Sequence, residues 1–348
     1  MPPSSVGRTL KQLRGKSTNL ESLPVFYPLT FQPIFKERIW GGDNLRRLYQ
    51  KPVPQGQKIG ESWEVSDRSG DVSVVSIGQF AGRGLRELLQ TFPKEILGSA
   101  RPNTAGLFPL LAKIIDAEQT LSLQVHPPAL KAEALGGEPK TEMWYIAHAA
   151  PGAELFVGLK RGVSRGDFQE NVDKGTVAEC FHRVPVKSGD VMFLPSGRVH
   201  ALGAGIVIFE VQQNSDTTYR VFDWNRLDDA GQPRALHVAQ SLESIDFEDF
   251  EPSLVSTVAE PRDGYFVRQL VRDPLFDVDL IEGNIAPIPL ESGRMTLLAV
   301  VGGRMSVHCD GINTFISTGG FCLVPAACAG VTCVPAGGAA FLRVIAGS

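Results

Sequence analysis

The chain has 348 residues, 43% of them hydrophobic and 21% charged, which is an ordinary composition for one large or two smaller folded domains. Its net charge of −4 argues against a nucleic-acid-binding protein, which normally carries a basic face, but is compatible with an anionic small substrate. No apolar run reaches the roughly 18 residues of a membrane-spanning helix, so we expect no membrane partner.

The amino-terminal segment and the cysteines bear on location. Residues 1–23 are basic and lack an apolar central segment, so a secretory signal is not predicted. We expect a disordered tail here, and a transit peptide remains the alternative. The five cysteines form no C-x-x-C pair, which is typical of reduced thiols and favours a cytoplasmic protein.

The 36 glycines and 24 prolines predict short strands joined by turns rather than long helices. The first predicted helix is short, with Asp43-Asn44 as its cap and Tyr49 near its end. Apolar residues at helical spacing predict a helical insertion over 84–97, interrupted at Pro93.

Beyond residue 109 the pattern changes to short apolar runs, which predict strands with small helical patches between them, one of them over 164–173. Residues 241–264 are polar and acidic and are predicted to be a linker. We therefore expect a catalytic domain over 24–240 and a second domain over 265–348.

An internal repeat supports two copies of one β module. Ser188–Pro195 aligns without gaps on Thr318–Pro325, although a match of eight residues can also arise by chance. The second copy has Gly330 where the first has His200. This difference predicts one copy with a working site and one copy without it.

Metal-binding side chains are concentrated in the first copy. Gln124 and His126 are two positions apart on a predicted strand, so their side chains point to the same face. Glu142 opens another strand, and His200 follows a Pro–Gly turn. Two imidazoles, one carboxylate and one amide oxygen suit a borderline divalent ion such as Zn²⁺.

Each of these residues has an ordinary structural alternative. His126 alone could be a packed, hydrogen-bonded histidine, and Glu142 alone a strand-edge carboxylate. The spacing G-x5-P-x-G-x2-H over Gly189–His200 matches the second metal motif of cupin barrels. Gln124-x-His126 stands where the first cupin motif has H-x-H, and sixteen positions separate His126 from Glu142. Both departures disfavour a generic cupin dioxygenase or storage protein.

In these departures, and in the segments around them, the sequence resembles the type I mannose-6-phosphate isomerases. The resemblance begins near residue 26, is strongest over 105–226, and points to the shorter bacterial branch of the family. The segments that carry it are Pro28–Phe31 with Trp40–Gly42, Gly60–Glu64, Leu121–Pro128, Pro139–Tyr145, Pro195–Gly203 and Gln213–Arg226.

The resemblance implies a mainly β fold of two cupin-type β-barrels (jelly-rolls) with short helical insertions, the second barrel without metal. It implies one Zn²⁺ per chain, held by Gln124, His126, Glu142 and His200. It further implies catalytic roles for Arg220, Lys140 and Asp216, and substrate contacts from Ser122, Lys140 and Arg220.

The activity implied is interconversion of mannose 6-phosphate and fructose 6-phosphate through an enediol(ate). Lys140 beside a cation is expected to have a lowered pKa and to carry protons. Two alternatives remain open: another metal-dependent cupin enzyme, such as an oxygenase or phosphoglucose isomerase, and a non-catalytic sugar-binding protein. The sequence does not predict the oligomeric state or the general base.

Overall fold

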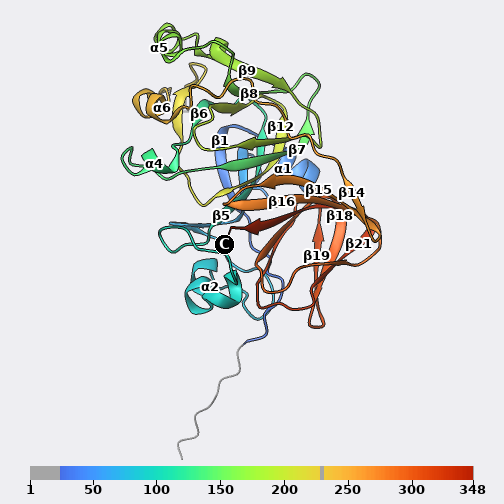
Figure 1. The fold of residues 1–348 in the computed structure, drawn as a ribbon. Coiled ribbons are helices and arrows are strands. Elements are labelled where there is room, and N and C mark those ends of the chain that lie inside the picture. The colour runs from blue at the N-terminus through green and yellow to red at the C-terminus, as the bar shows by residue number, and fades with distance from the viewer. Residues whose placement is uncertain (1–23, 228–230, 348) are drawn as a thin grey trace, which may run out of the picture.

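The computed structural model describes residues 24–227 and 231–347, so the tail predicted at residues 1–23 lies outside the described residues. The described chain is mainly β with short helices, which confirms the predicted fold class. Figure 1 shows most of its first half above its second half, with helix α2 (Leu85–Thr91) drawn lower, beside the second half, and most of the helices at the periphery. No helix of this part of the chain is long and apolar enough to cross a membrane.

The first half contains two antiparallel sheets. In strand order, the six-stranded sheet consists of β1 (Ile34–Gly42), β2 (Ile59–Val65), β5 (Leu110–Ala117), β12 (Ile206–Gln213), β7 (Glu142–Ala149) and β10 (Val191–Leu194). The five-stranded sheet consists of β13 (Tyr219–Phe222), β6 (Leu123–Val125), β11 (His200–Leu202), β8 (Glu154–Leu159) and β9 (Phe181–Pro185).

Apolar side chains of both sheets pack against each other. Trp144 and Ile208 of the six-stranded sheet share one buried cluster with Leu155, Val157 and Leu202 of the five-stranded sheet. This packing turns the inner faces of the two sheets toward each other, which is the arrangement of a β-sandwich or jelly-roll. Side chains at the strand ends of both sheets can therefore meet.

Short helices and one small hairpin connect these strands. They are α1 (Asn44–Tyr49), β3 (Asp67–Arg68), β4 (Asp71–Val72), α2 (Leu85–Thr91), α3 (Pro93–Leu97), α4 (Ala129–Ala132), α5 (Arg165–Lys174), the 3₁₀ helix η1 (Val177–Cys180) and α6 (Val238–Ser244). The predicted helical insertion corresponds to α2 and α3, which break at Pro93 because proline suits the first turn of a helix. Helix α5 begins with a capping box between Ser164 and Asp167.

The prediction that Asp43-Asn44 caps the start of α1 is wrong about which side chain accepts the capping hydrogen bond. Asp43 occupies the cap position, but its side chain makes no capping hydrogen bond. Instead the carboxylate of Asp116 on β5 accepts from the backbone N–H of Asn44 at 2.6 Å and from its side chain at 2.8 Å. The free backbone N–H at the start of α1 is thus paired by a residue 72 positions away. The local sequence around α1 does not indicate this contact.

The second half is an eight-stranded antiparallel sheet. Its main path is β14 (Glu260–Arg262), β15 (Tyr265–Arg272), β16 (Phe276–Gly283), β21 (Thr332–Ala346), β18 (Thr296–Cys309) and β19 (Ile312–Ser317), with β17 (Ile288–Pro289) on β21 and β20 (Phe321–Val324) on β18. All five cysteines are buried and unpaired.

The two halves share a continuous apolar core. Phe209 of β12 stacks on Phe321 of β20 with ring centroids 5.5 Å apart. Leu29 pairs with Leu323 through the backbone, so the start of the described chain lies against the second half. The division into domains at residues 240 and 264 stays a prediction.

Candidate metal centre

Two neighbouring strands of one sheet, β6 and β11, and one strand of the facing sheet, β7, supply the predicted ligands. Gln124 on β6 is the cross-strand partner of His200 on β11 and, on its other side, of Arg220 on β13. His126 directly follows β6, and Glu142 is the first residue of β7 in the facing sheet. Strand pairing therefore brings together residues that are far apart in the sequence.

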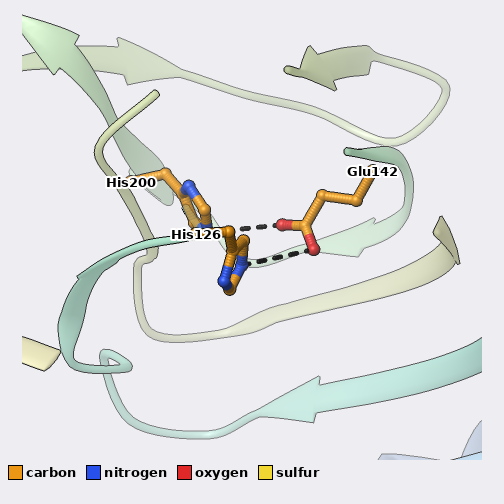
Figure 2. Close-up of side chains that lie close together, drawn as sticks. All are labelled: His126, Glu142 and His200. Atoms are coloured by element: carbon orange, nitrogen blue, oxygen red, sulfur yellow. Dashed lines mark ion pairs between the residues drawn. The ribbon is translucent and has the colours of Figure 1, made fainter. Parts of the chain in front are cut away.

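Figure 2 shows His126, Glu142 and His200 pointing toward one another. The carboxylate of Glu142 faces both rings from one side, with Oε2 3.5 Å from Nε2 of His126 and Oε1 3.3 Å from Nε2 of His200. All three residues are buried, and their ligand atoms lie within 4.8 Å of one another. The structure thus brings together three of the four predicted ligands in one cluster.

Backbone carbonyls fix the tautomers of both histidines. Nδ1 of His126 donates to the carbonyl of Thr217 at 2.7 Å, and Nδ1 of His200 donates to the carbonyl of Arg198 at 2.9 Å. Because a neutral imidazole carries one proton, Nε2 of each ring is then a bare acceptor. This orientation by outer-shell carbonyls is the usual arrangement of metal-binding histidines.

The cluster leaves buried acceptors without donors. Nε2 of His126 and both carboxylate oxygens of Glu142 are buried and make no hydrogen bond, although the ammonium of Lys140 forms an ion pair with Oε2 at 3.0 Å. Unpaired buried acceptors are costly, and a cation close to both rings and the carboxylate would satisfy them together. The donor set of this structure therefore fits a divalent metal ion.

Electrostatics keep the three groups in the protonation states that metal binding requires. Burial, with a contribution from Lys140, lowers the pKa of His126 to about 3, and burial also lowers the pKa of His200. Burial alone would raise the pKa of Glu142, but the ammonium of Lys140 holds it well below its usual value. Both rings are neutral and the carboxylate is ionised near neutral pH.

Gln124 is the fourth predicted ligand. Its amide nitrogen lies 3.3 Å from Nε2 of His200, at the edge of the cluster. Amide oxygen and nitrogen are nearly interchangeable in shape, so turning the amide presents the oxygen at the same position. Gln124 also lines the neighbouring cavity and so bridges the buried cluster and the space open to a ligand.

A cavity of about 480 Å³ adjoins the cluster. All of the predicted residues outside the His–Glu–His cluster line it, namely Ser122, Gln124, Lys140, Asp216 and Arg220. Further charged residues line it as well: Glu37, Arg38, Glu61, Lys113, Glu210 and Arg234. The dense polar lining suits a small, highly polar ligand rather than an apolar one.

Arg220 lies half-buried in the cavity wall. Its Nε donates to Oγ of Ser122 at 3.3 Å and its Nη1 donates to the carbonyl of Ala235 at 2.9 Å. Among the described residues, no carboxylate lies within ion-pair distance of this guanidinium. Burial, followed by the positive charge of Arg234, lowers its pKa. In the described part of the chain this cavity cation therefore has no directly paired acid, and Asp223 is the nearby carboxylate that offsets part of its charge.

Lys140 differs from its sequence-based prediction. Its ammonium lies 3.0 Å from Oε2 of Glu142. Burial would lower the pKa of Lys140, but Glu142 and then Glu210 raise it above the usual value. The predicted lowering of this pKa is therefore wrong for the arrangement described, because the nearest charge to Lys140 is a carboxylate.

Sequence reasoning missed a buried ionic network in the cavity wall. Lys113 on β5 lies 3.0 Å from Glu210 on β12 and 3.8 Å from Glu61 on β2, and Glu61 also pairs with Arg38 at 2.7 Å. Trp144 donates to Glu210 at 2.8 Å. The sequence does contain a signal for this network, namely charged residues such as Lys113 and Glu210 inside otherwise apolar strands. Charged residues are rarely buried without a partner, so these positions indicate buried ion pairs.

A second missed feature surrounds Asp223. This buried carboxylate accepts from Arg226 at 2.5 Å, and from Arg234 through Nε at 2.7 Å and Nη2 at 2.5 Å. With Arg220 nearby, three arginines gather around one acid. Arg220 and Arg234 both line the cavity, so this side of it is positively charged.

Facing antiparallel sheets with a buried His–Glu–His cluster between them define a cupin-type protein with a candidate metal site. Residues 29–140 match the family model for the catalytic domain of type I phosphomannose isomerase. The chain is 40% identical over 221 residues to a probable mannose-6-phosphate isomerase of Bacillus subtilis, covering 63% of this chain and 68% of that protein. The chain belongs to the type I mannose-6-phosphate isomerase family.

Two further comparisons agree. The chain is 38% identical over 252 residues to a mannose-6-phosphate isomerase of Streptococcus mutans, covering 72% of this chain and 77% of that protein. The crystal structure of the mannose 6-phosphate isomerase from Bacillus subtilis superposes with a TM-score of 0.82 at 30% identity, covering 91% of this chain and 99% of that one. The predicted cupin fold class is confirmed.

Proposed function

We propose that this chain is a zinc-dependent aldose–ketose isomerase that interconverts mannose 6-phosphate and fructose 6-phosphate. One observation carries the proposal: a buried cluster of metal-binding acceptors opens, through Gln124, onto a cavity lined by Arg220, which has no carboxylate within ion-pair distance among the described residues. Family membership supplies the substrate pair, and the cavity suits an anionic sugar. The other cupin enzymes and a non-catalytic sugar-binding protein are disfavoured by this combination.

The chain's residues would hold Zn²⁺ through His126, Glu142 and His200, with the amide oxygen of Gln124 as a fourth ligand. Two imidazoles and one carboxylate are a common zinc donor set. When bound, the ion supplies Lewis-acid stabilisation of negative charge on oxygen. One carboxylate neutralises only part of its charge, so the site stays electrophilic.

Arg220 and Lys140 are assigned to the substrate's oxygens. Isomerisation moves a proton between C2 and C1, and negative charge develops on oxygen in the enediol(ate). Arg220 is permanently charged and already positioned by Ser122 and Ala235, so it stabilises that charge with little rearrangement. Lys140, held protonated by Glu142, donates hydrogen bonds beside it, and Asp216 contributes a carboxylate at the exposed side of the cavity.

The substrate's phosphate is assigned to the arginine side of the cavity. Ser122 and Arg220 were predicted to contact substrate, and Arg234 adds a second guanidinium that Asp223 holds in place. A phosphate dianion matches both the charge and the forked geometry of arginine donors. The ligand would thus span the cavity, its anionic end near Arg234 and its sugar oxygens near Gln124.

The test is a coupled assay of fructose 6-phosphate formation from mannose 6-phosphate, run beside oxygen-uptake measurements. Isomerisation without oxygen consumption supports the proposal, and the reverse pattern identifies an oxygenase instead. Five buried, unpaired thiols support a cytoplasmic location, which we include in the proposal.

A further inference from the structure

Part of the acidic tract predicted to be a linker packs against the turn that precedes His200. Residues 244–251 form a segment that we call the strap. The backbone N–H of Asp246 donates to the carbonyl of Gly197 at 2.9 Å. Leu159 on β8 donates to the carbonyl of Asp249 at 3.0 Å and accepts from the N–H of Glu251 at 2.9 Å. The strap is therefore fastened both to β8 and to the turn before His200.

The contact between strap and turn is close. Gly197 has a φ of +97°, and a Cβ atom placed on it would lie 3.3 Å from the carbonyl oxygen of Ser244. A side chain at this position would press against the strap in a backbone conformation that favours glycine. Turn and strap thus pack backbone to backbone, so movement of one displaces the other.

A bidentate ion pair between Arg198 and Asp249 stabilises the contact between the turn and the strap. Arg198 donates through Nε to Oδ2 of Asp249 at 2.8 Å and through Nη2 to Oδ1 at 2.7 Å. Its Nη1 donates to the carbonyl of Phe193 at 2.8 Å. Both charged side chains are only 16% exposed. A paired, partly buried arginine fork fixes geometry as well as charge.

The turn held in this way touches both histidine ligands. The carbonyl of Arg198 accepts from Nδ1 of His200 at 2.9 Å. The N–H of Gly197 donates to the backbone carbonyl of His126 at 2.8 Å. The position of the turn therefore sets the tautomer and ring orientation of His200 and fixes the backbone beside His126.

We propose that Asp249 is a positioning residue of the metal centre, acting through Arg198 on the orientation of His200. The inference rests on the proposed function for the identity of the ion. Asp249 contacts neither the ligand cluster nor the cavity. Its carboxylate satisfies two guanidinium donors. Without it the turn loses its ionic anchor to the strap, while the Asp246–Gly197 backbone hydrogen bond and every metal ligand remain present.

The variant Asp249→Asn keeps the size of the side chain and removes its charge. We expect its zinc dissociation constant to rise about tenfold, as for other outer-shell partners of metal ligands, measured by competition with a chromogenic chelator. The visible absorption spectrum of the Co²⁺-loaded variant should also change, because it reports ligand geometry. Arg198→Lys retains the charge but not the fork and should behave in the same way.

The matched control is Glu243→Gln. Glu243 belongs to the same acidic tract, but its partner Arg165 lies on α5, both side chains are 53% exposed, and the pair does not touch the turn. Zinc affinity and the Co²⁺ spectrum should be unchanged in this variant.

Thermal unfolding with and without zinc separates positioning from simple structural support. A positioning role reduces the stabilisation that zinc adds, whereas a structural role lowers the stability of both forms equally. Zinc affinity within twofold of wild type and an unchanged Co²⁺ spectrum in both Asp249→Asn and Arg198→Lys would overturn the proposal while leaving the proposed function intact. A wild-type chain that binds no zinc would contradict both the positioning role of Asp249 and the proposed zinc-dependent function.

Discussion

Nε2 of His200 and Oε1 of Glu142 face each other across 3.3 Å, and both are hydrogen-bond acceptors. The proton of His200 is on Nδ1, engaged with the carbonyl of Arg198, so no hydrogen can bridge the two atoms of a neutral ring and a carboxylate. The same relationship holds between His126 and Glu142. Apposed acceptors in a buried place are repulsive unless a cation lies between them.

This relationship predicts the behaviour of His200→Ala. We expect zinc binding to weaken more than about 100-fold, because loss of a direct ligand should cost more than loss of an outer-shell partner. Isomerase activity should be lost, while the circular dichroism spectrum stays that of a folded β protein. Zinc content is measured by elemental analysis. His182→Ala, on the distant strand β9, is the control and should retain its zinc. Normal zinc content in His200→Ala would contradict the proposed site.

Arg220→Lys tests whether the guanidinium of Arg220 stabilises the negative charge that develops on the substrate's oxygen. Lysine keeps the charge but cannot reproduce the donors that reach Ser122 and Ala235. We expect turnover to fall about 100-fold, as when one preorganised donor to a developing oxyanion is removed. The melting temperature should change little. A loss of thermal stability that matches the loss of activity would instead identify a structural arginine.

Arg234→Gln tests the assignment of the phosphate. The substitution removes one guanidinium from the cavity wall and leaves Arg220 in place. We expect the KM for mannose 6-phosphate to rise about tenfold, corresponding to one weakened charged hydrogen bond, with a smaller change in kcat. Inorganic phosphate should inhibit the variant less than the wild type. An unchanged KM together with unchanged phosphate inhibition would show that the phosphate binds elsewhere.

Glu61 provides a prediction about pH and stability. Burial would raise its pKa, but Lys113 and Arg38 lower it to about 2, against an ordinary value of 4.5. A carboxylate with a depressed folded-state pKa stabilises the protein above pH 4.5, and this stabilisation is lost as the pH falls toward 2. The shift corresponds to about 3 kcal/mol at neutral pH, by order of magnitude.

Glu61→Gln should therefore lower the free energy of unfolding at pH 7, and the difference from wild type should narrow below pH 4.5. Urea denaturation at several pH values measures it. The control is Glu87→Gln, which removes an exposed ion pair with Arg83 and should change stability little at any pH. A difference between Glu61→Gln and wild type that is constant with pH would contradict the ionic account.

The sequence predicts most of the candidate metal ligands because Gln124, His126 and His200 have local signatures. Strand alternation places Gln124 and His126 on one face, and the Pro–Gly turn precedes His200 at motif spacing. The fold class follows from the same short apolar runs. By contrast, the Lys113–Glu210 pair and the capping of Asn44 by Asp116 depend on strand pairing between distant segments. The local sequence pattern does not indicate which distant segments pair. Residues 244–251 were predicted to be part of a linker for the same reason, because their partners Gly197 and Leu159 are far away in the sequence.

The central claim is that a cation bound by His126, Glu142 and His200 enables the isomerisation. The most direct measurement is the coupled assay on protein stripped with a chelator and then supplied with stoichiometric Zn²⁺. We predict loss of fructose 6-phosphate formation on stripping and its recovery on adding zinc, with no recovery in His200→Ala. Full activity of the stripped protein, verified to be metal-free by elemental analysis, would contradict the claim.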